Sequence, residues 1–384
     1  MSRRMSFSIQ SRPLFCPTTV HFGAHLSSQL VAACAQLSRQ LVIISDATVA
    51  TLYGAPLQRY LKENGLLTQL LTFPPGEPYK NRATKAALED ALLSAHYGRD
   101  TGLIALGGGV TTDLVGFLAA TYMRGLPYLS IPTSFMAMVD ASLGGKTGVN
   151  SPWGKNHLGA FYPPRAVFLD SSFLTSLSPF DFRQGLAEVI KYALIEDASL
   201  FDRLATHTAA LNPKEGALLT YLIQTSCHIK KKIVEQDMTD RHRRHLLNFG
   251  HTIGHALEHV DRYRLAHGEA VAIGLLTESW LSTQLGTLSF EEFERIEQLL
   301  VRVGFSFSLA CVPTVQALRC ALQSDKKSAC SAPCFVTLEA IGAASSHDGR
   351  YCTPVQTPLL DEALHWMLGK ISTYKKCSTY ALSD

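Results

Sequence analysis

An alternation of strand and helix patterns through the N-terminal half constrains the fold more than any other feature of this sequence. Apolar runs of strand length occupy residues 40–46, 68–73, 102–105 and 128–131. Helical patterns over residues 47–64 and 81–97 separate the first three, with Asn81 as an N-cap and Gly98 just after the second helix. Such alternation is typical of βαβ units, so we predict a parallel sheet with helices on both faces.

The alternation stops after residue 170, and from Pro179 onward the pattern is helical almost to the end. A chain of 384 residues is too long for one typical core, which favours two domains. We therefore predict an α/β, Rossmann-like domain over residues 1–178, followed by an all-α domain over residues 179–384.

Composition argues against several classes of protein. The chain is 46% hydrophobic and 17% charged, which is typical of globular rather than disordered proteins. The formal net charge of +3 favours neither a nucleic-acid nor a membrane partner but suits an anionic small-molecule substrate. The start of the chain, MSRRMSFSIQ, has two arginines but no apolar core of signal-peptide length after them, and no apolar run approaches the length of a membrane span. The nine cysteines are odd in number and form no CxxC pair, so we expect reduced thiols in the cytoplasm.

A triple glycine at residues 107–109 follows the third strand pattern and opens a helix. Backbone N–H groups in such a turn can bind a pyrophosphate at the positive end of the helix, although a plain tight turn fits equally well. Its position favours a dinucleotide site, because dinucleotides bind at the carboxyl ends of strands in parallel sheets. Asp46 ends an early strand, where its carboxylate can accept a hydrogen bond from a ribose hydroxyl. No arginine accompanies Asp46, and this favours NAD over its 2′-phosphorylated relative. Glu77 and Lys80 lie in the loop after another strand.

Two segments rich in glycine and lysine suggest a binding site for anions. They are GGK, ending at Lys146, and GKN, ending at Asn156. A lysine in a glycine turn is usually a solvated loop tip, but two such turns, together with Asn156 and Arg124, favour a pocket for phosphate or carboxylate groups. Asp140 is flanked by small and apolar residues, where an unpaired carboxylate would be unfavourable.

The stretch at residues 248–274, NFGHTIGHALEHVDRYRLAHGEAVAIG, contains four histidines. His251, His255 and His259 are spaced four residues apart and share one face of a helix, whereas His267 lies near the start of a second helical pattern that begins near Gly268. Helix histidines are usually solvated or satisfied in the core. The alternative is a zinc site in which His251, His267 and the carboxylate of Glu188 leave one coordination position open for substrate.

Further charged residues accompany these candidate ligands. Lys191 lies three residues after Glu188 in GLAEVIKY, a spacing that is ordinarily a solvated ion pair. The neighbouring residues are largely apolar, so we expect at least one of the two to face a site. The charged segment that contains Lys230 and Arg244 is short and interrupted by acids, which suits specific anion contacts rather than nucleic-acid binding.

Taken together, these segments resemble those of the 3-dehydroquinate synthases. The motifs that carry the resemblance are GGGVTTDLVGFLAATYMRG, PTSFMAMVDASLGGKTGVN, GKNHLGAFY, GLAEVIKY, NFGHTIGHALE, HGEAVAIG and a late DKK. They occur in the family's order and span about residues 15–370. The resemblance implies an N-terminal NAD-binding α/β domain, a C-terminal helical domain, a site in the cleft between them, and a homodimer.

The resemblance also implies an activity, that of an NAD- and metal-dependent carbon-oxygen lyase in the shikimate pathway of aromatic amino acid biosynthesis. Such an enzyme converts 3-deoxy-D-arabino-heptulosonate 7-phosphate into 3-dehydroquinate and phosphate, through transient oxidation by NAD, phosphate elimination, reduction and intramolecular aldol closure. The expected metal is Zn2+, with Co2+ as an alternative. The rivals are another sugar-phosphate cyclase, a metal-dependent polyol dehydrogenase of related fold that would release NADH, and a non-catalytic anion- or nucleic-acid-binding protein. GGKTGVN and GKN favour the dehydroquinate branch.

The resemblance assigns roles to residues at matching positions. Those expected to bind the metal are Glu188, His251 and His267. Those expected to bind NAD are Asp46, Glu77, Lys80, Gly109, Val110, Thr111, Thr112, Asp113, Thr133, Ser134, Lys146 and Lys155, with the addition of Phe173, Leu174, Thr175 and Ser176. Those expected to act on the substrate are Lys146, Asp140, Asn156, Lys191, Lys230, Arg244, Asn248, His255, one of Lys326 and Lys327, and Arg124, the last reaching in from a second subunit.

One position has no counterpart in the family's motifs, and two others depart from the usual residue. His259 corresponds to no motif position and is interpreted as an ordinary helix histidine. Thr112 and Asp240 occupy positions where a glycine and a glutamate, respectively, are usual in the family. We expect both differences to adjust affinity rather than abolish activity.

Overall fold

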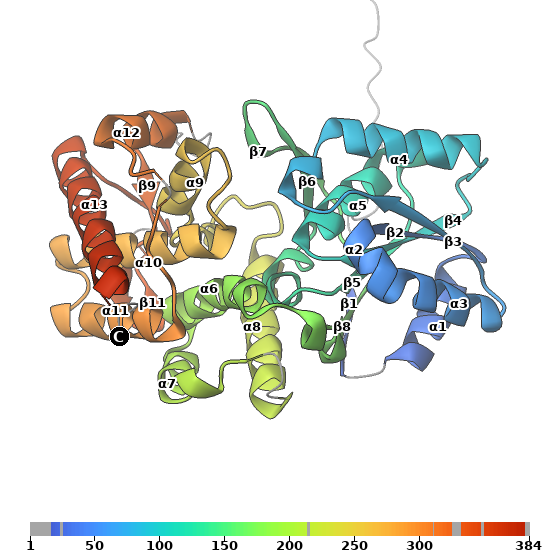
Figure 1. Ribbon diagram of the computed structural model, residues 1–384, viewed down its shortest axis with the longest axis horizontal. Coiled ribbons are helices and arrows are strands. Elements are labelled where there is room, and N and C mark those ends of the chain that lie inside the picture. Colours follow the sequence, from blue (N-terminus) through green and yellow to red (C-terminus); the bar gives the residue numbers. More distant parts are fainter. Residues whose placement is uncertain are drawn as a thin grey trace, which may run out of the picture.

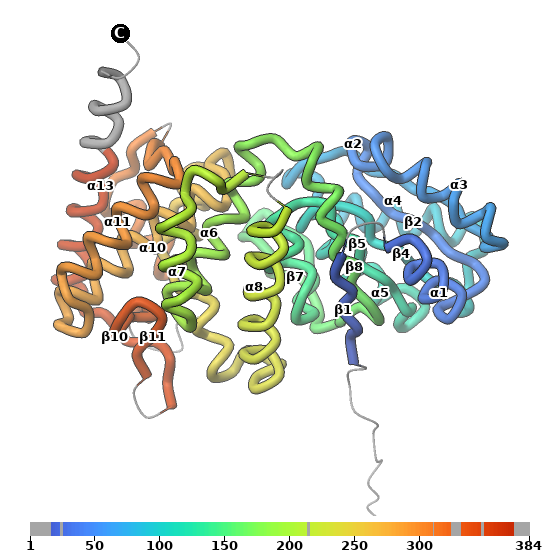
Figure 2. Tube along the Cα trace, turned by 90° about the horizontal axis from the view of Figure 1, so that it is seen from below, coloured from blue at the N-terminus to red at the C-terminus, as the bar shows by residue number. Residues whose placement is uncertain are grey.

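The computed structural model describes residues 17–23, 26–212, 216–309, 311–324, 332–346 and 349–380. Its two halves lie side by side along the long axis of the molecule, with the parallel sheet at one end and the helices at the other (Figure 1). Helix α8 (Gly216–Gln236) lies between the sheet and the more distant helices in both views (Figure 2). The predicted fold class, a Rossmann-like α/β domain followed by a helical domain, is confirmed.

Six parallel strands form the sheet, in the order β1-β8-β5-β4-β2-β3. They are β1 (Thr19–Gly23), β2 (Gln40–Asp46), β3 (Leu67–Phe73), β4 (Thr101–Gly107), β5 (Tyr128–Pro132) and β8 (Ala166–Asp170). Strands β4, β5 and β8 are buried along their whole length, as expected for parallel strands covered on both faces. Alternate residues separate two cores, because Ile43 and Ile104 face one side of the sheet and Val42 and Leu103 the other.

Helices cover both faces of this sheet. Those packed on the Ile43 face are α1 (Ser27–Leu37) and α3 (Ala55–Glu63), and those on the Val42 face are α4 (Arg82–Ser94) and α5 (Gly109–Thr121). The helix predicted over residues 47–64 is present as three consecutive pieces, namely α2 (Ala47–Val49), η1 (Ala50–Gly54) and α3. Gly65, with a φ of 82°, ends it as a left-handed glycine should.

The two ends of α4 test the capping predictions separately. The Asn81 side chain accepts a hydrogen bond from the Thr84 N–H at 2.9 Å, which confirms the N-cap. The prediction that Gly98 follows the helix directly was wrong. The helix ends at Ser94, and His96, with a φ of 58°, takes the left-handed position of a Schellman motif in which the Tyr97 N–H reaches the Leu92 carbonyl.

An antiparallel hairpin extends from the sheet half toward helix α9 (His251–Val260) (Figure 1). It consists of β6 (Lys146–Ser151) and β7 (Gly154–Phe161). The GGK segment is a turn, since Gly144 and Gly145 have φ values of 85° and 67°. The GKN segment is not a turn. It forms the start of β7, where the pairing register shifts and Asn156 has a φ of 56°. This β-bulge turns the Asn156 side chain out of the strand alternation, and glycine-lysine composition alone does not distinguish a bulge from a turn.

The C-terminal half is built mainly from helices. They are α6 (Pro179–Glu196), α7 (Ala198–Thr206), α8, α9, α10 (His267–Gln284), α11 (Phe290–Val303), α12 (Val315–Ser324) and α13 (Thr357–Tyr380). Helix α10 is buried on every side from Gly268 to Ser282, which explains why its sequence has no polar face. Helices α6, α9, α11 and α13 pack around it.

Two short strand pairs interrupt the helical half, where we expected helices alone. They are β9 (Cys334–Phe335) with β12 (Thr353–Pro354), and β10 (Leu338–Ala340) with β11 (Ala343–Ala344). Strands of two or three residues are too short to leave an alternating pattern in the sequence. Within the ranges given above, no helix combines the length and the apolar character needed to cross a membrane.

Candidate active site and metal centre

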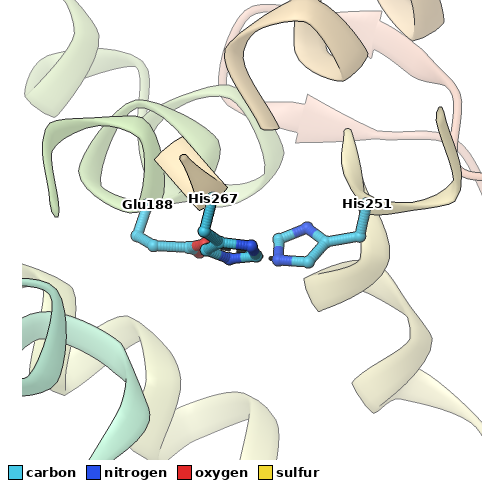
Figure 3. Close-up of side chains that lie close together, drawn as sticks. All are labelled: Glu188, His251 and His267. Carbon is cyan, nitrogen blue, oxygen red and sulfur yellow. Dashed lines mark ion pairs between the residues drawn. The ribbon is translucent and has the colours of Figure 1, made fainter. Parts of the chain in front are cut away.

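Three predicted metal ligands converge from three different helices (Figure 3). Glu188 lies on α6, whereas His251 and His267 are the first residues of α9 and α10. Glu188 Oε1 lies 3.3 Å from His251 Nε2 and 3.4 Å from His267 Nε2. The ligand atoms of all three lie within 4.8 Å of one another, so one ion can contact them together.

The hydrogen bonds around this group suit a divalent metal ion. Lys191 donates to Glu188 Oε2, whereas Glu188 Oε1 is buried and receives no hydrogen bond from the described residues. His251 Nδ1 lies 3.1 Å from the Phe249 carbonyl oxygen, and His267 Nδ1 lies 3.1 Å from Glu258 Oε1. Because these oxygens accept hydrogen bonds, each histidine would keep a proton on Nδ1 and offer its Nε2 lone pair to a bound metal ion. Two imidazoles and one carboxylate with an open fourth position suit Zn2+ or Co2+.

Burial and charge shift the pKa values of the three residues differently. Burial alone would raise the pKa of Glu188, but Lys191 and His251 outweigh it and hold that pKa well below its usual value. Burial lowers the pKa of His251. For His267 burial acts in the same direction, but the carboxylates of Glu258 and Glu188 raise its pKa to about 9. A second set, His255, Glu258 and His267, also has metal-ligand spacing, but Glu258 already binds Lys155 there.

Asp140, the carboxylate that the sequence places among apolar residues, is the centre of an adjoining charged group. It lies in η4 (Ala137–Ala141) and accepts hydrogen bonds from the Tyr192 hydroxyl and from Lys230 Nζ, the latter at 2.9 Å. Lys191 Nζ lies 3.8 Å from the same oxygen. Burial alone would raise the pKa of Asp140, but the ammonium groups of Lys230 and Lys191 outweigh it and lower that pKa. Asp140 therefore holds two buried lysines beside the metal ligands.

Arg244 is fully buried at the boundary between the two halves. It lies in η7 (Arg243–Asn248) and donates to the carbonyl oxygens of Met238 and Gly144 at 2.8 and 2.9 Å. Asp237 accepts the backbone N–H of Arg244 and so anchors this segment. Lys146, at the start of β6, forms an ion pair with Asp240 across the same boundary.

Predicted NAD residues gather at the carboxyl edge of the sheet. Lys80 Nζ lies 2.5 Å from Asp113 Oδ2 on α5 and 2.6 Å from Asn156 Oδ1 on the hairpin. Ser134 Oγ is the nearest atom to a Cβ placed on Gly108, at 3.2 Å, so a side chain at residue 108 would crowd the glycine turn. Asp46 caps α2, its Oδ1 accepting the Thr48 and Val49 N–H groups.

Several predicted site residues lie elsewhere or face away. Arg124 ends η3 (Tyr122–Arg124), at the opposite end of α5 from the glycine run, so its own chain does not place it in the cluster. The Leu174 side chain is fully buried in the core. Thr112 is buried, and its hydroxyl bonds back to the Gly109 carbonyl. Lys326 and Lys327 fall outside the described residues.

Two further predicted residues, His255 and Asn248, lie close to the metal ligands. The His255 ring centre lies 5.4 Å from that of His251 and 6.2 Å from that of His267, and Asn248 ends η7 just before α9. Sequence reasoning missed Glu258 and Tyr192. A signal existed for Glu258, which lies seven residues after His251 and therefore on the same helix face. No comparable signal marks Tyr192 within its apolar helix.

Comparison with known proteins identifies the family. Sequence profiles of the 3-dehydroquinate synthase N-terminal and C-terminal regions match residues 70–184 and 185–328. A 3-dehydroquinate synthase of Nitrosomonas europaea is 42% identical over 348 residues, which cover 90% of this chain and 93% of that protein.

Solved structures of related cyclases share the fold. A 2-epi-5-epi-valiolone synthase from Streptomyces hygroscopicus, with NAD+ and Zn2+ bound, is 30% identical with a TM-score of 0.85, and the match covers 95% of this chain and 99% of that one. A 2-deoxy-scyllo-inosose synthase complexed with carbaglucose-6-phosphate, NAD+ and Co2+ is 25% identical with a TM-score of 0.82, covering 90% and 96% of the two chains. By its sequence profiles and its relatives, the chain belongs to the 3-dehydroquinate synthase family.

Proposed function

We propose that this protein converts 3-deoxy-D-arabino-heptulosonate 7-phosphate into 3-dehydroquinate and phosphate, using NAD and a divalent metal ion, Zn2+ or Co2+. The observation that carries the proposal is the convergence of Glu188, His251 and His267 beside buried lysines and a dinucleotide-binding sheet edge. Curated relatives about 40% identical carry the same activity in their names. Related cyclases bound to NAD+ with Zn2+ or Co2+ support the cofactors.

The metal ligands and their neighbours orient the substrate for oxidation. When bound, NAD supplies a hydride acceptor and the metal supplies a Lewis acid for the substrate hydroxyl. Glu188, His251 and His267 would hold this metal ion at the boundary between the sheet and the helices. Burial of Glu188 and Lys191 excludes water from this side of the site.

Buried cations provide the phosphate and carboxylate contacts. Lys191, Lys230 and Arg244 are each at most 5% exposed, so their charges are weakly screened and stabilise an anion strongly. Lys146 and Asn156 approach from the hairpin, where they can bind a second anionic group of the substrate. A substrate with both a phosphate and a carboxylate matches this number of cations better than a neutral polyol does.

We further propose a homodimer in which Arg124 completes the site of the partner. Arg124 and Met123 both have positive φ values, 67° and 49°, a strained conformation that tends to occur where a side chain has a function. The boundary between the domains at residues 178 and 179 and the cytoplasmic location remain predictions.

The direct test is release of inorganic phosphate from the heptulosonate phosphate by the purified protein with NAD and Zn2+. The second candidate, another sugar-phosphate cyclase, is favoured by the solved neighbours. Glucose 6-phosphate and a heptulose 7-phosphate that lacks the carboxylate serve as comparison substrates. Phosphate release from either of these, and none from the heptulosonate phosphate, would overturn the assignment in favour of that candidate.

A further inference from the structure

The side chain of Glu258 connects the sheet half of the molecule with the metal centre. It lies on α9 and is only 2% exposed. Its Oε1 lies 2.8 Å from Lys155 Nζ on strand β7 and 3.1 Å from His267 Nδ1 at the start of α10. One carboxylate oxygen therefore contacts both a residue expected to bind NAD and a residue expected to bind the metal.

The contact with His267 determines how this histidine meets a metal ion. A carboxylate on Nδ1 keeps the proton there, fixes the plane of the ring and makes Nε2 a stronger donor to the metal. The contact with Lys155 acts against this effect, because an ammonium group at 2.8 Å draws negative charge away from the imidazole. How strongly Glu258 supports His267 thus depends on where the Lys155 ammonium lies.

Lys155 has a second carboxylate within reach on the sheet side. Glu77 Oε1 lies 3.8 Å from Lys155 Nζ, so the ammonium lies between an acid of each half. A dinucleotide at the edge of the sheet adds further acceptors on the Glu77 side. Movement of Lys155 toward them would leave more of the Glu258 charge to act on His267.

We propose that Glu258 is a positioning residue that orients His267 for the metal ion and, through Lys155, couples metal binding to dinucleotide binding, so that each strengthens the other. This inference rests on the proposed function, namely on the ligand set and on NAD as cofactor. Linkage requires the coupling to be reciprocal, and couplings of this kind typically change affinity by roughly 5-fold to 150-fold.

A purely structural role for the Lys155–Glu258 pair is the competing explanation. Buried ion pairs often contribute little net stability, and Glu258 Oε2 is buried without a hydrogen-bond partner among the described residues. An ion pair of this kind is therefore expected to add little to the stability of the contact between the two halves, so a purely structural role explains Glu258 poorly. A structural role predicts a lower melting temperature in variants but unchanged metal binding.

The test measures the dissociation constant of Co2+ by chelator competition, with and without saturating NAD, and records the visible Co2+ spectrum. Glu258→Gln keeps the size and a hydrogen-bond acceptor but removes the charge. We expect metal affinity to fall about 10-fold to 100-fold, with an altered spectrum and no response to NAD. Lys155→Met should bind Co2+ without NAD at least as tightly as the natural protein and should also lose the response to NAD.

Glu235→Gln is the matched control, because Glu235 forms an exposed ion pair with Lys231, and it should behave as the natural protein does. Unchanged Co2+ affinity and spectrum in Glu258→Gln, or a persistent NAD response in Lys155→Met, would overturn the inference. If Glu258→Gln does not fold, Lys155→Met decides. Co2+ loss in His251→Ala with normal Co2+ binding in Glu258→Gln refutes only this inference, whereas full Co2+ occupancy in His251→Ala refutes the ligand set itself.

Discussion

At the scale of single residues, buried charges form two linked groups around Asp140 and Glu188. Asp140 faces Lys230 and Lys191, and Glu188 faces Lys191 and two histidines. Removing one partner of a buried pair typically costs about 3–5 kcal/mol, whereas replacing both partners by apolar residues is often neutral or stabilising. Stability alone therefore does not account for these groups, whereas the proposed binding of an anionic substrate near a metal ion would.

Neighbouring lysines 230 and 231 allow this explanation to be tested. Lys230 is 5% exposed and binds Asp140, whereas the Lys231 side chain is 65% exposed and pairs with Glu235. We expect Lys230→Ala to lose about 3 kcal/mol of unfolding free energy and at least about 100-fold in kcat/KM for phosphate release. Lys231→Ala should change unfolding free energy by less than about 0.5 kcal/mol and leave kcat/KM unaltered. Equal losses in the two variants would mean that general charge, rather than a pocket, matters.

Cysteine reactivity supplies a second residue-level prediction. Burial raises the pKa of Cys34 and of Cys227 to about 12, so almost none of either thiol is ionised at pH 8. Cys311 and Cys320 are exposed. Brief iodoacetamide treatment at pH 8, followed by peptide mass spectrometry, should label Cys311 and Cys320 and spare Cys34 and Cys227 until the protein is unfolded. Fast native labelling of Cys34 would show that α1 does not stay packed on the sheet.

The sequence motifs predicted the candidate metal ligands well, but they did not predict the residues that form hydrogen bonds with other site residues from distant parts of the chain. The histidine and glutamate motifs indicated three ligands whose atoms do converge. Glu258 and Tyr192 were missed because they bind Lys155 and Asp140, which lie 103 and 52 residues away in the chain. Spacing rules describe one helix or one strand, so they do not anticipate contacts between distant elements.

At the scale of elements, the crossing of α9 and α10 determines the geometry of the metal ligands. His251 and His267 begin these helices, and Gly250 and Gly274 allow the two backbones to approach closely. Glu278 on α10 accepts the Gly250 N–H at 2.8 Å and so caps the start of α9. The spatial relation between the two histidines thus depends on one glycine contact and one buried cap.

Gly274→Ala is predicted to disrupt this crossing. An added Cβ would lie 1.8 Å from the Gly250 carbonyl oxygen, which is backbone and cannot rotate away. We expect a loss of about 3 kcal/mol or more in unfolding free energy and weaker Zn2+ binding in chelator competition. Gly369→Ala on α13, where an added Cβ meets nothing within 4 Å, should be neutral or stabilising. A Gly274→Ala protein with normal stability and zinc affinity would contradict the role given to this contact.

Element prediction succeeded where periodicity is long and failed where it is short. Buried parallel strands and the helices between them leave runs of four residues or more, and most of the sheet followed from these, although β1 was not predicted. No such pattern marks the bulged hairpin β6–β7, because a bulge breaks the alternation of apolar and polar residues. Nor does one mark the pairs β9–β12 and β10–β11, because strands of two or three residues are too short to show an alternation. The hairpin is the most important of these misses, because it carries the predicted site residues Lys146, Lys155 and Asn156.

At the scale of the whole molecule, ion pairs across the site join the sheet half to the helical half. Lys146 pairs with Asp240, and Lys155 pairs with Glu258. Asp240 is shorter than the glutamate usual in the family, yet it still reaches Lys146. Because both lysines are expected to contact ligands as well, binding of cofactor and substrate is expected to change how the halves are held together.

This arrangement distinguishes a synthase from a dehydrogenase by the fate of the cofactor. If the halves close over one site, hydride is taken and returned before the product leaves, so NAD is required but not consumed. With NAD at one hundredth of the substrate concentration, we expect phosphate to accumulate for many turnovers while absorbance at the NADH wavelength stays near zero. A metal-dependent polyol dehydrogenase predicts the reverse, with NADH rising mole for mole with product until NAD is exhausted, and no phosphate. Both signals can be followed in one sample, and steady stoichiometric NADH would reject the synthase assignment despite the sequence motifs.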